Sequence, residues 1–123
     1  MTYITAKDVI DAVEKVRPNA YSDKEKLKWI NEVEGKIHDE IIKNSEIGKD
    51  NEFVTVSSPD TLLTADSRFS QMYVYYLLAK IDFFDNEPTK YNNDLAMFDS
   101  AYESFACWHI RTYVPQPCKG FYV

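Results

Sequence analysis

The chain has 123 residues, a formal net charge of −6 at pH 7, three glycines and two cysteines. This length predicts one domain that buries roughly two thirds of its unfolded surface. That is enough for a hydrophobic core that needs no disulfide or metal ion for stability. The acidic balance disfavours nucleic-acid binding through phosphate contacts, and no apolar run reaches the ~18 residues of a membrane helix. Cys107 and Cys118 form neither a disulfide framework nor a metal-site spacing. No signal peptide is visible, so a reducing, cytosolic place of synthesis is expected.

The first two predicted helices have clear start signals. Thr5 is the expected N-cap of a helix over 6–16, which ends before a proline because the preceding residue avoids the helical region. Ser22 and Glu25 form a capping box that opens a second helix. Apolar residues then recur at helical spacing, and Glu34 interrupts their stripe.

The connection over 45–66 is the least regular part of the chain. Residues 53–56 alternate in the pattern of a short strand, and the Ser-Ser-Pro-Asp run after them is rich in turn formers. A connection of about 20 residues is long for a compact domain, and such connections often carry function.

Twelve of the eighteen aromatic residues lie in two further predicted helices, over 67–84 and 88–113. The first of these is apolar almost all the way round, so it must be buried on every side or shared with another chain. Lys80 stands in the middle of its aromatic face. Two prolines then forbid helix and leave a tail over 114–123.

These elements predict an all-α fold. We expect a four-helix bundle-like domain over 1–113, with the irregular connection over 45–66 between helices two and three, and an extended C-terminal tail over 114–123. The expected core consists of apolar residues from the last three helices: Leu27, Ile30, Ile37, Leu77, Ile81, Leu95, Phe98, Tyr102 and Phe105.

Sequence motifs of catalytic and metal-binding sites are mostly missing. A di-iron bundle needs Glu-x-x-His on two helices, but glycine and alanine stand three residues before His38 and His109. Glu34 and His38 share a helix face, yet two ligands make no metal site, and a solvated helix edge explains them. Cys107 and His109 point to different helix faces, which favours a small buried or half-buried thiol over a nucleophile. We expect no enzyme activity, no cofactor and no metal.

Ionisable residues on or beside apolar faces define a candidate buried polar cluster: Glu34, Lys80, His109 and Arg111. An unpaired buried charge is costly, so Glu34 is expected within hydrogen-bond reach of one of the other three. Three readings stay open. The residues form one satisfied cluster in the core, or Lys80 reaches a neighbouring subunit, or the group is an active site.

Apolar residues in the two irregular segments define a candidate interface: Phe53, Val54, Val56, Leu62, Leu63, Phe121, Tyr122 and Val123. An isolated subunit has little reason to expose such side chains. We therefore expect contacts with other subunits or partners there. For the tail, packing onto the chain's own helices is the alternative.

Three segments carry a resemblance: residues 27–37, residues 73–79, and residues 91–113 with Tyr91, Phe98, Tyr102 and Trp108. In order and spacing they are similar to the small head–tail connector (adaptor) proteins of tailed phages and prophages. The resemblance covers nearly the whole chain except 45–66 and the tail.

The resemblance implies a helical bundle that forms a ring beneath the portal, extends the DNA channel and docks the stopper or tail. Its implied partners are further copies of the chain, the portal protein and the stopper or tail protein. DNA passes through the ring without specific binding, and no membrane is involved. The implied location is the head–tail interface of the virion, after synthesis in the cytoplasm of the bacterial host. The residues themselves also allow a small acidic helical protein-binding module or regulator, or an enzyme with a site in the bundle core.

Overall fold

The computed structural model describes residues 3–41 and 56–113, and this part of the chain is mostly helical. It contains the helices α1 (Ala6–Val16), α2 (Asp23–Glu40), α3 (Ser70–Phe84) and α4 (Pro88–Tyr113). It also contains the strands β1 (Tyr3–Thr5) and β2 (Leu62–Asp66), and a 3-10 turn, η3 (Ser67–Phe69), that leads into α3.

The predicted starts of α1 and α2 are confirmed. The Thr5 side chain accepts a hydrogen bond from the backbone N–H of Asp8 (3.2 Å), and the Asp8 carboxylate accepts one from the Thr5 N–H (3.0 Å). Ser22 caps α2 by accepting from the Glu25 N–H at 3.2 Å, which is one of the two bonds of the predicted capping box. Each bond satisfies a backbone donor that the first helical turn leaves without a partner.

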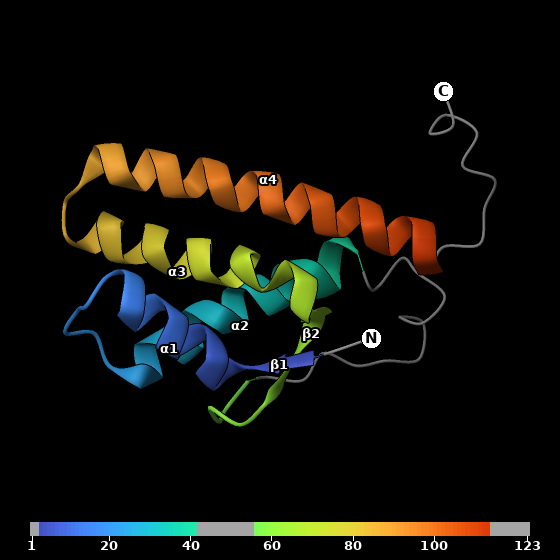
Figure 1. The fold of residues 1–123 in the computed structure, drawn as a ribbon, viewed down its shortest axis with the longest axis horizontal. Helices are drawn as coiled ribbons and strands as arrows, with labels where there is room; N and C mark the ends of the chain where they lie inside the picture. The colour runs from blue at the N-terminus through green and yellow to red at the C-terminus, as the bar shows by residue number, and fades with distance from the viewer. Residues whose placement is uncertain (1–2, 42–55, 114–123) are drawn as a thin grey trace.

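The turn between α3 and α4 has a defined geometry. The Glu87 N–H donates to the Asp82 carbonyl (2.9 Å), and the Asn86 N–H donates to the Phe83 carbonyl (3.3 Å). This is the Schellman pattern of helix ends. It requires a left-handed residue, which Asn86 supplies with φ of 60°, since asparagine tolerates that region better than most side chains. Pro88 then opens α4, and α3 and α4 form an antiparallel hairpin (Figure 1).

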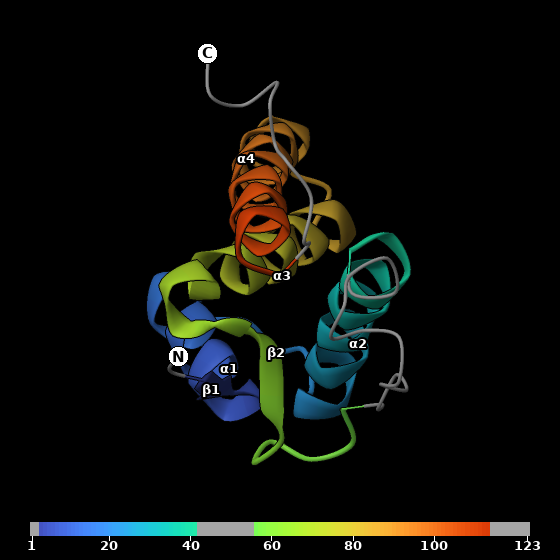
Figure 2. The same cartoon turned by 90° about the vertical axis from the view of Figure 1, so that its right-hand side faces the viewer.

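Helix α3 lies at the centre of the molecule. Figures 1 and 2 show α4 on one side of α3 and the pair α1 and α2 on the other. Eight of its residues are buried: Met72, Tyr73, Val74, Leu77, Leu78, Ala79, Ile81 and Asp82. The chain itself therefore covers most of this all-round apolar helix. The exposed residues are Gln71 in its first turn and, at its C-terminal end, Phe83 and Phe84, which are 60% and 55% exposed.

The small sheet was not predicted. Strand β1 pairs antiparallel with β2, with Tyr3 opposite Asp66 and Thr5 opposite Leu62. The strand expected at 53–56 lies outside the described residues apart from Val56, which is buried and in no strand. The Asn31 amide holds Val56 by donating to its carbonyl (2.7 Å) and accepting from its N–H (2.5 Å).

The predicted core residues lie in or against the core. Six of them are buried: Ile30, Ile37, Leu77, Ile81, Phe98 and Phe105. Three are half-buried and pack against it: Leu27, Leu95 and Tyr102. The core also includes residues of α1, such as Val9 and Val13, so the shortest helix contributes to it as well.

Phe98→Ala is expected to destabilise the protein by about 3–5 kcal/mol, the range for truncating a large aromatic residue in a packed core. Phe98 is buried, and its ring centroid lies 5.0 Å from that of Tyr76 and 5.8 Å from that of Tyr102. Chemical denaturation measures the effect. Its neighbour Met97, 47% exposed, supplies the control, because Met97→Ala should change stability by less than about 0.5 kcal/mol. Equal midpoints for the two variants would place the Phe98 ring outside the core.

Candidate functional site

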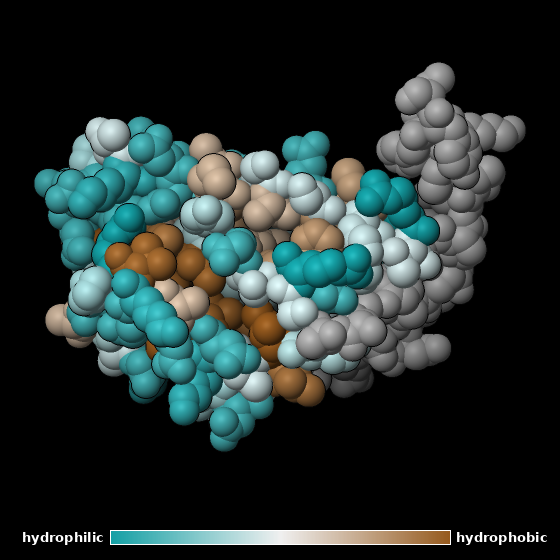
Figure 3. Space-filling view, in the orientation of Figure 1, coloured by the Kyte–Doolittle hydropathy of each residue, from teal (hydrophilic) through white to brown (hydrophobic). Residues whose placement is uncertain are grey.

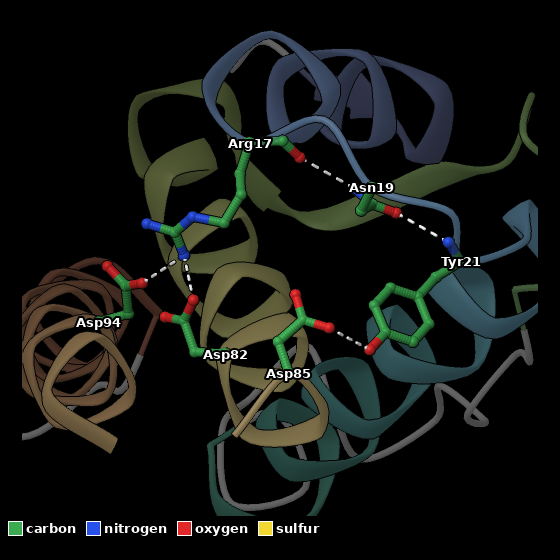
Figure 4. Close-up of polar contacts among 6 residues, drawn as sticks. All are labelled: Arg17, Asn19, Tyr21, Asp82, Asp85 and Asp94. Atoms are coloured by element: carbon green, nitrogen blue, oxygen red, sulfur yellow. Dashed lines mark hydrogen bonds and ion pairs between the residues drawn. The ribbon is translucent and has the colours of Figure 1, made fainter. Parts of the chain in front are cut away.

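Arg17 connects three parts of the fold. It stands at the C-terminal end of α1, and its guanidinium donates to Asp82 in α3 (2.5 Å) and to Asp94 in α4 (2.9 Å) (Figure 4). Burial raises the pKa of Asp82 to about 7, with a further contribution from its hydrogen bond with Asp94, although Arg17 acts in the opposite direction. One cation thus holds two carboxylates that would otherwise repel each other across the α3–α4 hairpin.

A second set of bonds fastens the connection between α1 and α2 to the same end of the hairpin. The Asn19 side chain donates to the Arg17 carbonyl (3.0 Å) and accepts from the Tyr21 N–H (3.1 Å). The Tyr21 hydroxyl then donates to Asp85 at 2.6 Å, just beyond the end of α3 (Figure 4). This end of the molecule is therefore fixed by polar contacts as well as by packing.

Glu34 lies in the interface between α2 and α3, near the N-terminal end of α3 and away from the α3–α4 turn. It is 4% exposed, and its carboxylate accepts from the Tyr73 hydroxyl (2.5 Å), the Thr64 N–H (3.0 Å) and the Thr64 hydroxyl (2.7 Å). The Tyr73 hydroxyl also accepts from the Ala65 N–H at 3.2 Å. Burial and the adjacent carboxylate hold the pKa of Tyr73 well above its usual value. The network fastens β2 to both helices.

The structure does not gather the four predicted cluster residues in one place. The donors to Glu34 are Tyr73 of α3 and Thr64, and neither was among the predicted candidates. Lys80 lies 3.2 Å from a Glu32 oxygen, with its ammonium 5.5 Å from the centre of the Tyr76 ring.

The other two predicted cluster residues lie on α4. His109 is buried, with its ring centroid 5.9 Å from that of Phe105, and burial lowers the pKa of His109. Arg111 is exposed.

Sequence reasoning missed Lys26, which is 1% exposed and paired with Glu14 of α1. A signal was present, because Lys26, Ile30, Val33 and Ile37 share one helical face. Tyr73 also had a signal, since a buried tyrosine hydroxyl usually finds a partner. The contacts of Arg17 had no sequence signal, because Arg17 lies outside any periodic pattern of apolar residues.

Among the described members of the candidate interface, the structure separates buried from exposed residues. Val56 and Leu63 lie in the chain's own core, whereas Leu62 is 61% exposed. Phe53, Val54 and the three members in the tail lie outside the described residues. For them the interface role stays a prediction.

The hairpin end carries a continuous run of rings, which we call the aromatic edge: Tyr91, Phe83, Phe84, Trp29 and Tyr21. Successive ring centroids lie 5.3–6.0 Å apart, and the Trp29 and Phe84 rings are stacked. Phe83 and Phe84 contribute most of the exposed surface. Figure 3 shows further hydrophobic surface on one face of the molecule, along the line where α1 meets α3, with hydrophilic residues around it.

Beside the aromatic edge lies a groove of about 350 Å³, which we call the α3–α4 groove. Its lining residues are Tyr76, Ala79, Lys80, Phe83, Tyr91 and Leu95. Four of the six are aromatic rings or a leucine, and Lys80 supplies one cation. Such a lining suits an apolar or aromatic side chain and offers no group arranged for chemistry.

The described residues do not bring together three His, Cys, Asp or Glu side chains that could hold a metal ion. Within the same residues, no helix is long and apolar enough to cross a membrane. The expectation of a buried or half-buried Cys107 is wrong, since this free thiol is exposed on the side of α4 that faces away from α3.

No protein-family model, curated protein or solved structure matches the chain.

Tyr73→Phe is expected to destabilise the protein by about 1.5–3 kcal/mol, because it leaves a buried carboxylate oxygen of Glu34 without its donor. Tyr75→Phe is the matched control. The hydroxyl of half-buried Tyr75 makes no hydrogen bond within the described part of the chain, so its loss should change stability by less than about 0.5 kcal/mol. Urea denaturation at pH 7 measures both. Equal effects would show that the bond to Glu34 contributes little.

Asp82 is expected to make stability fall as the pH rises through about 7. Its pKa in the folded protein is raised to about 7, whereas an unfolded aspartate titrates near ~3.9. Its contribution to the free energy of unfolding is therefore complete below about pH 4 and is lost as the pH passes 7. His109 acts in the opposite direction, because its pKa is lowered by burial and stability then falls as the pH drops below ~6.5.

The difference between the wild type and Asp82→Asn isolates the Asp82 contribution. The free energy of unfolding of the wild type, relative to the variant, should decrease from pH 5 to pH 8 in urea denaturation. Asp99→Asn, an exposed change on α4, should give a difference that does not vary with pH. A pH-independent difference for Asp82→Asn would contradict the raised pKa.

Proposed function

We propose that the protein is a head–tail connector of a phage or prophage, a four-helix bundle-like subunit that assembles into a ring beneath the portal. The observation that carries this proposal is the resemblance of three segments to connector helices, together with their position in the fold. Residues 27–37 lie in α2, 73–79 in α3, and 91–113 in α4. Helix α3 contacts the other two, so the resembling segments form one connected part of the subunit.

The distribution of exposed surface supports an assembly role. Helix α3 is covered by its own chain, so its apolar sequence by itself does not require a partner. The aromatic edge is the surface that calls for a partner, because Phe83 and Phe84 stay largely exposed there. Exposed neighbouring aromatic side chains are typical of interaction sites and are a liability on an isolated monomer.

Helix α4 offers a second surface. Its 26 residues span ~39 Å, and the side away from α3 is polar and exposed along the described length, with Asp99, Glu103 and Arg111 among its residues. The chain as a whole carries a net charge of −6. An acidic ring suits a channel through which DNA must slide, because it does not attract the phosphate backbone.

The hydrogen bonds and ion pairs at the hairpin end, which we call the polar ties, make the subunit suitable for assembly. Arg17 joins α1 to Asp82 and Asp94, and Tyr21 joins the following connection to Asp85. These bonds hold the elements around the aromatic edge in place before any partner arrives. A preorganised surface loses less conformational entropy when it binds.

The test is sedimentation velocity of the protein alone over a range of concentrations and mixed with the portal protein from the same genome. We expect a ring-sized species at high concentration or in the presence of portal. Phe83→Ser combined with Phe84→Ser should weaken this assembly at least about tenfold, whereas Met97→Ser, an exposed apolar position on α4, should leave it unchanged. A monomer or dimer under all conditions would contradict the connector and favour a small binding module.

A further inference from the structure

One nitrogen of Arg17 serves two carboxylates at the hairpin end. Arg17 Nη1 donates to Asp82 Oδ1 (2.5 Å) and to Asp94 Oδ2 (2.9 Å), and Figure 4 shows both carboxylates directed at the same guanidinium. The Asp82 side chain is 2% exposed and the Asp94 side chain 14%. If both carboxylates were ionised, one negative charge would have no counterion in a site from which most water is excluded, which is unfavourable.

The geometry of Asp82 indicates that this residue holds a proton. Its Oδ2 atom is buried and accepts no hydrogen bond within the described residues, although an ionised oxygen in such a place needs a donor. Asp82 also forms a hydrogen bond with Asp94. An ionised carboxylate has no hydrogen to donate, so a bond between two carboxyl groups requires a proton on one of them. Asp82 is the more deeply buried of the pair, and burial favours the neutral form.

The remaining charged and titratable side chains at this end of the fold have less influence on Asp82. They come from each neighbouring element: Glu14 of α1, Tyr21 of the connection, Lys26 of α2, Asp85 and Glu87 of the turn after α3, and Lys90 of α4. Glu14 is paired with Lys26, and Asp85 accepts from Tyr21. Glu87 and Lys90 are exposed, so water and salt screen their charges. The charge state of Asp82 therefore depends mainly on its burial and on the two partners shown in Figure 4.

We propose that Arg17, Asp82 and Asp94 form a proton-operated contact, which we call the acid clasp, and that its opening weakens the contacts made by the aromatic edge. The acid clasp is closed while Asp82 is protonated and opens more readily once the proton is lost. The pKa of Asp82, raised to about 7 chiefly by burial, places this change near neutral pH. The effect on assembly rests on the proposed function, whereas the acid clasp itself does not.

The acid clasp is connected to the aromatic edge from two directions. Phe84 lies two residues after Asp82 in the chain. From the other direction, the Arg17 carbonyl accepts from Asn19, whose side chain also accepts from the Tyr21 N–H. The centroid of the Tyr21 ring lies 6.3 Å from that of Phe84. Opening of the acid clasp therefore loosens the connection between α1 and α2 and, with it, one ring of the aromatic edge.

Hydrogen exchange of single backbone amides measures this opening in the protein alone. The Arg17 N–H donates to the Val13 carbonyl (2.8 Å) and the Tyr21 N–H to Asn19 (3.1 Å), so both amides report on this end of the fold. After correction for intrinsic exchange, their opening constants should rise by up to about tenfold from pH 6 to pH 8. At pH 6 the closed form still holds the Asp82 proton, which an opened aspartate with a pKa of ~3.9 releases. At pH 8 both forms have lost it, so the rise levels off.

Asp82→Asn tests whether the proton is responsible. The amide has the shape of the protonated acid, stays neutral and keeps a hydrogen to donate to Asp94, so the opening constants of the same two amides should not change with pH. Asp99→Asn, which changes an exposed aspartate of α4, should retain the rise. Asp94→Asn should lower the pKa of Asp82, measured by NMR of its carboxyl carbon, because the repelling charge is removed and the new amide can donate to the ionised form. Circular dichroism of each variant confirms that the helices remain folded.

The same variants connect the acid clasp to assembly. In sedimentation velocity with the portal, association of the wild type should weaken several-fold from pH 6 to pH 8. Association of Asp82→Asn should stay constant over this range, and that of Asp99→Asn should follow the wild type.

The outcomes separate this inference from the proposed function. Opening constants that do not rise in the wild type, or that rise equally in Asp82→Asn, would overturn the acid clasp even if ring-sized species form with the portal. Opening that depends on Asp82, with association that is independent of pH, would overturn the effect on assembly. Opening that depends on Asp82 in a protein that never exceeds a dimer would support the acid clasp and contradict the connector.

Discussion

The burial of α3 is the constraint on which the rest of the structure depends. This helix is apolar almost all the way round, and α4 covers one side while α1 and α2 cover the other. Water is excluded from the buried surface around this helix, so a polar group that enters that space needs a partner. The buried side chain of Tyr73 meets this requirement, whereas Asp82 meets it with one carboxylate oxygen and leaves Oδ2 without a hydrogen-bond donor in the described part of the chain. Tyr73 donates to Glu34, and Asp82 accepts from Arg17.

The polar ties follow from this burial and also determine how the elements are joined. Glu34 fastens β2 to α2 and α3, Lys26 with Glu14 joins α2 to α1, and Arg17 joins the end of α1 to the hairpin. Buried ion pairs add little net stability compared with apolar packing, but breaking one partner is strongly destabilising. Each of these contacts joins residues from different elements, so it couples the position of one element to that of another. The aromatic edge therefore sits on a scaffold with a defined shape.

Helix positions were predictable from the sequence, but the partners of the polar residues were not. The capping residues Thr5 and Ser22, and the prolines that follow α1 and open α4, are local signals, and the structure confirms them. The sheet was missed because β1 has three residues and β2 five, too short for a clear alternation.

The partners of Glu34 illustrate the same limit over longer distances. Helical spacing placed Glu34 on an apolar face and so identified it as a buried residue in need of a donor. Thr64 comes from a strand thirty residues away, and a single sequence contains no signal for such a pairing. The aromatic edge had a partial signal, since Phe83 and Phe84 end an apolar helix directly before its break. Their exposure, 60% and 55%, is evident only in the folded structure.

The central claim is that copies of this protein form a ring on a portal. Single-particle electron microscopy of the protein mixed with assembled portal tests it most directly. The account predicts additional density stacked coaxially on the portal, with the helical subunits arranged in a closed ring. Portal particles without added density, in the presence of excess folded protein, would contradict it.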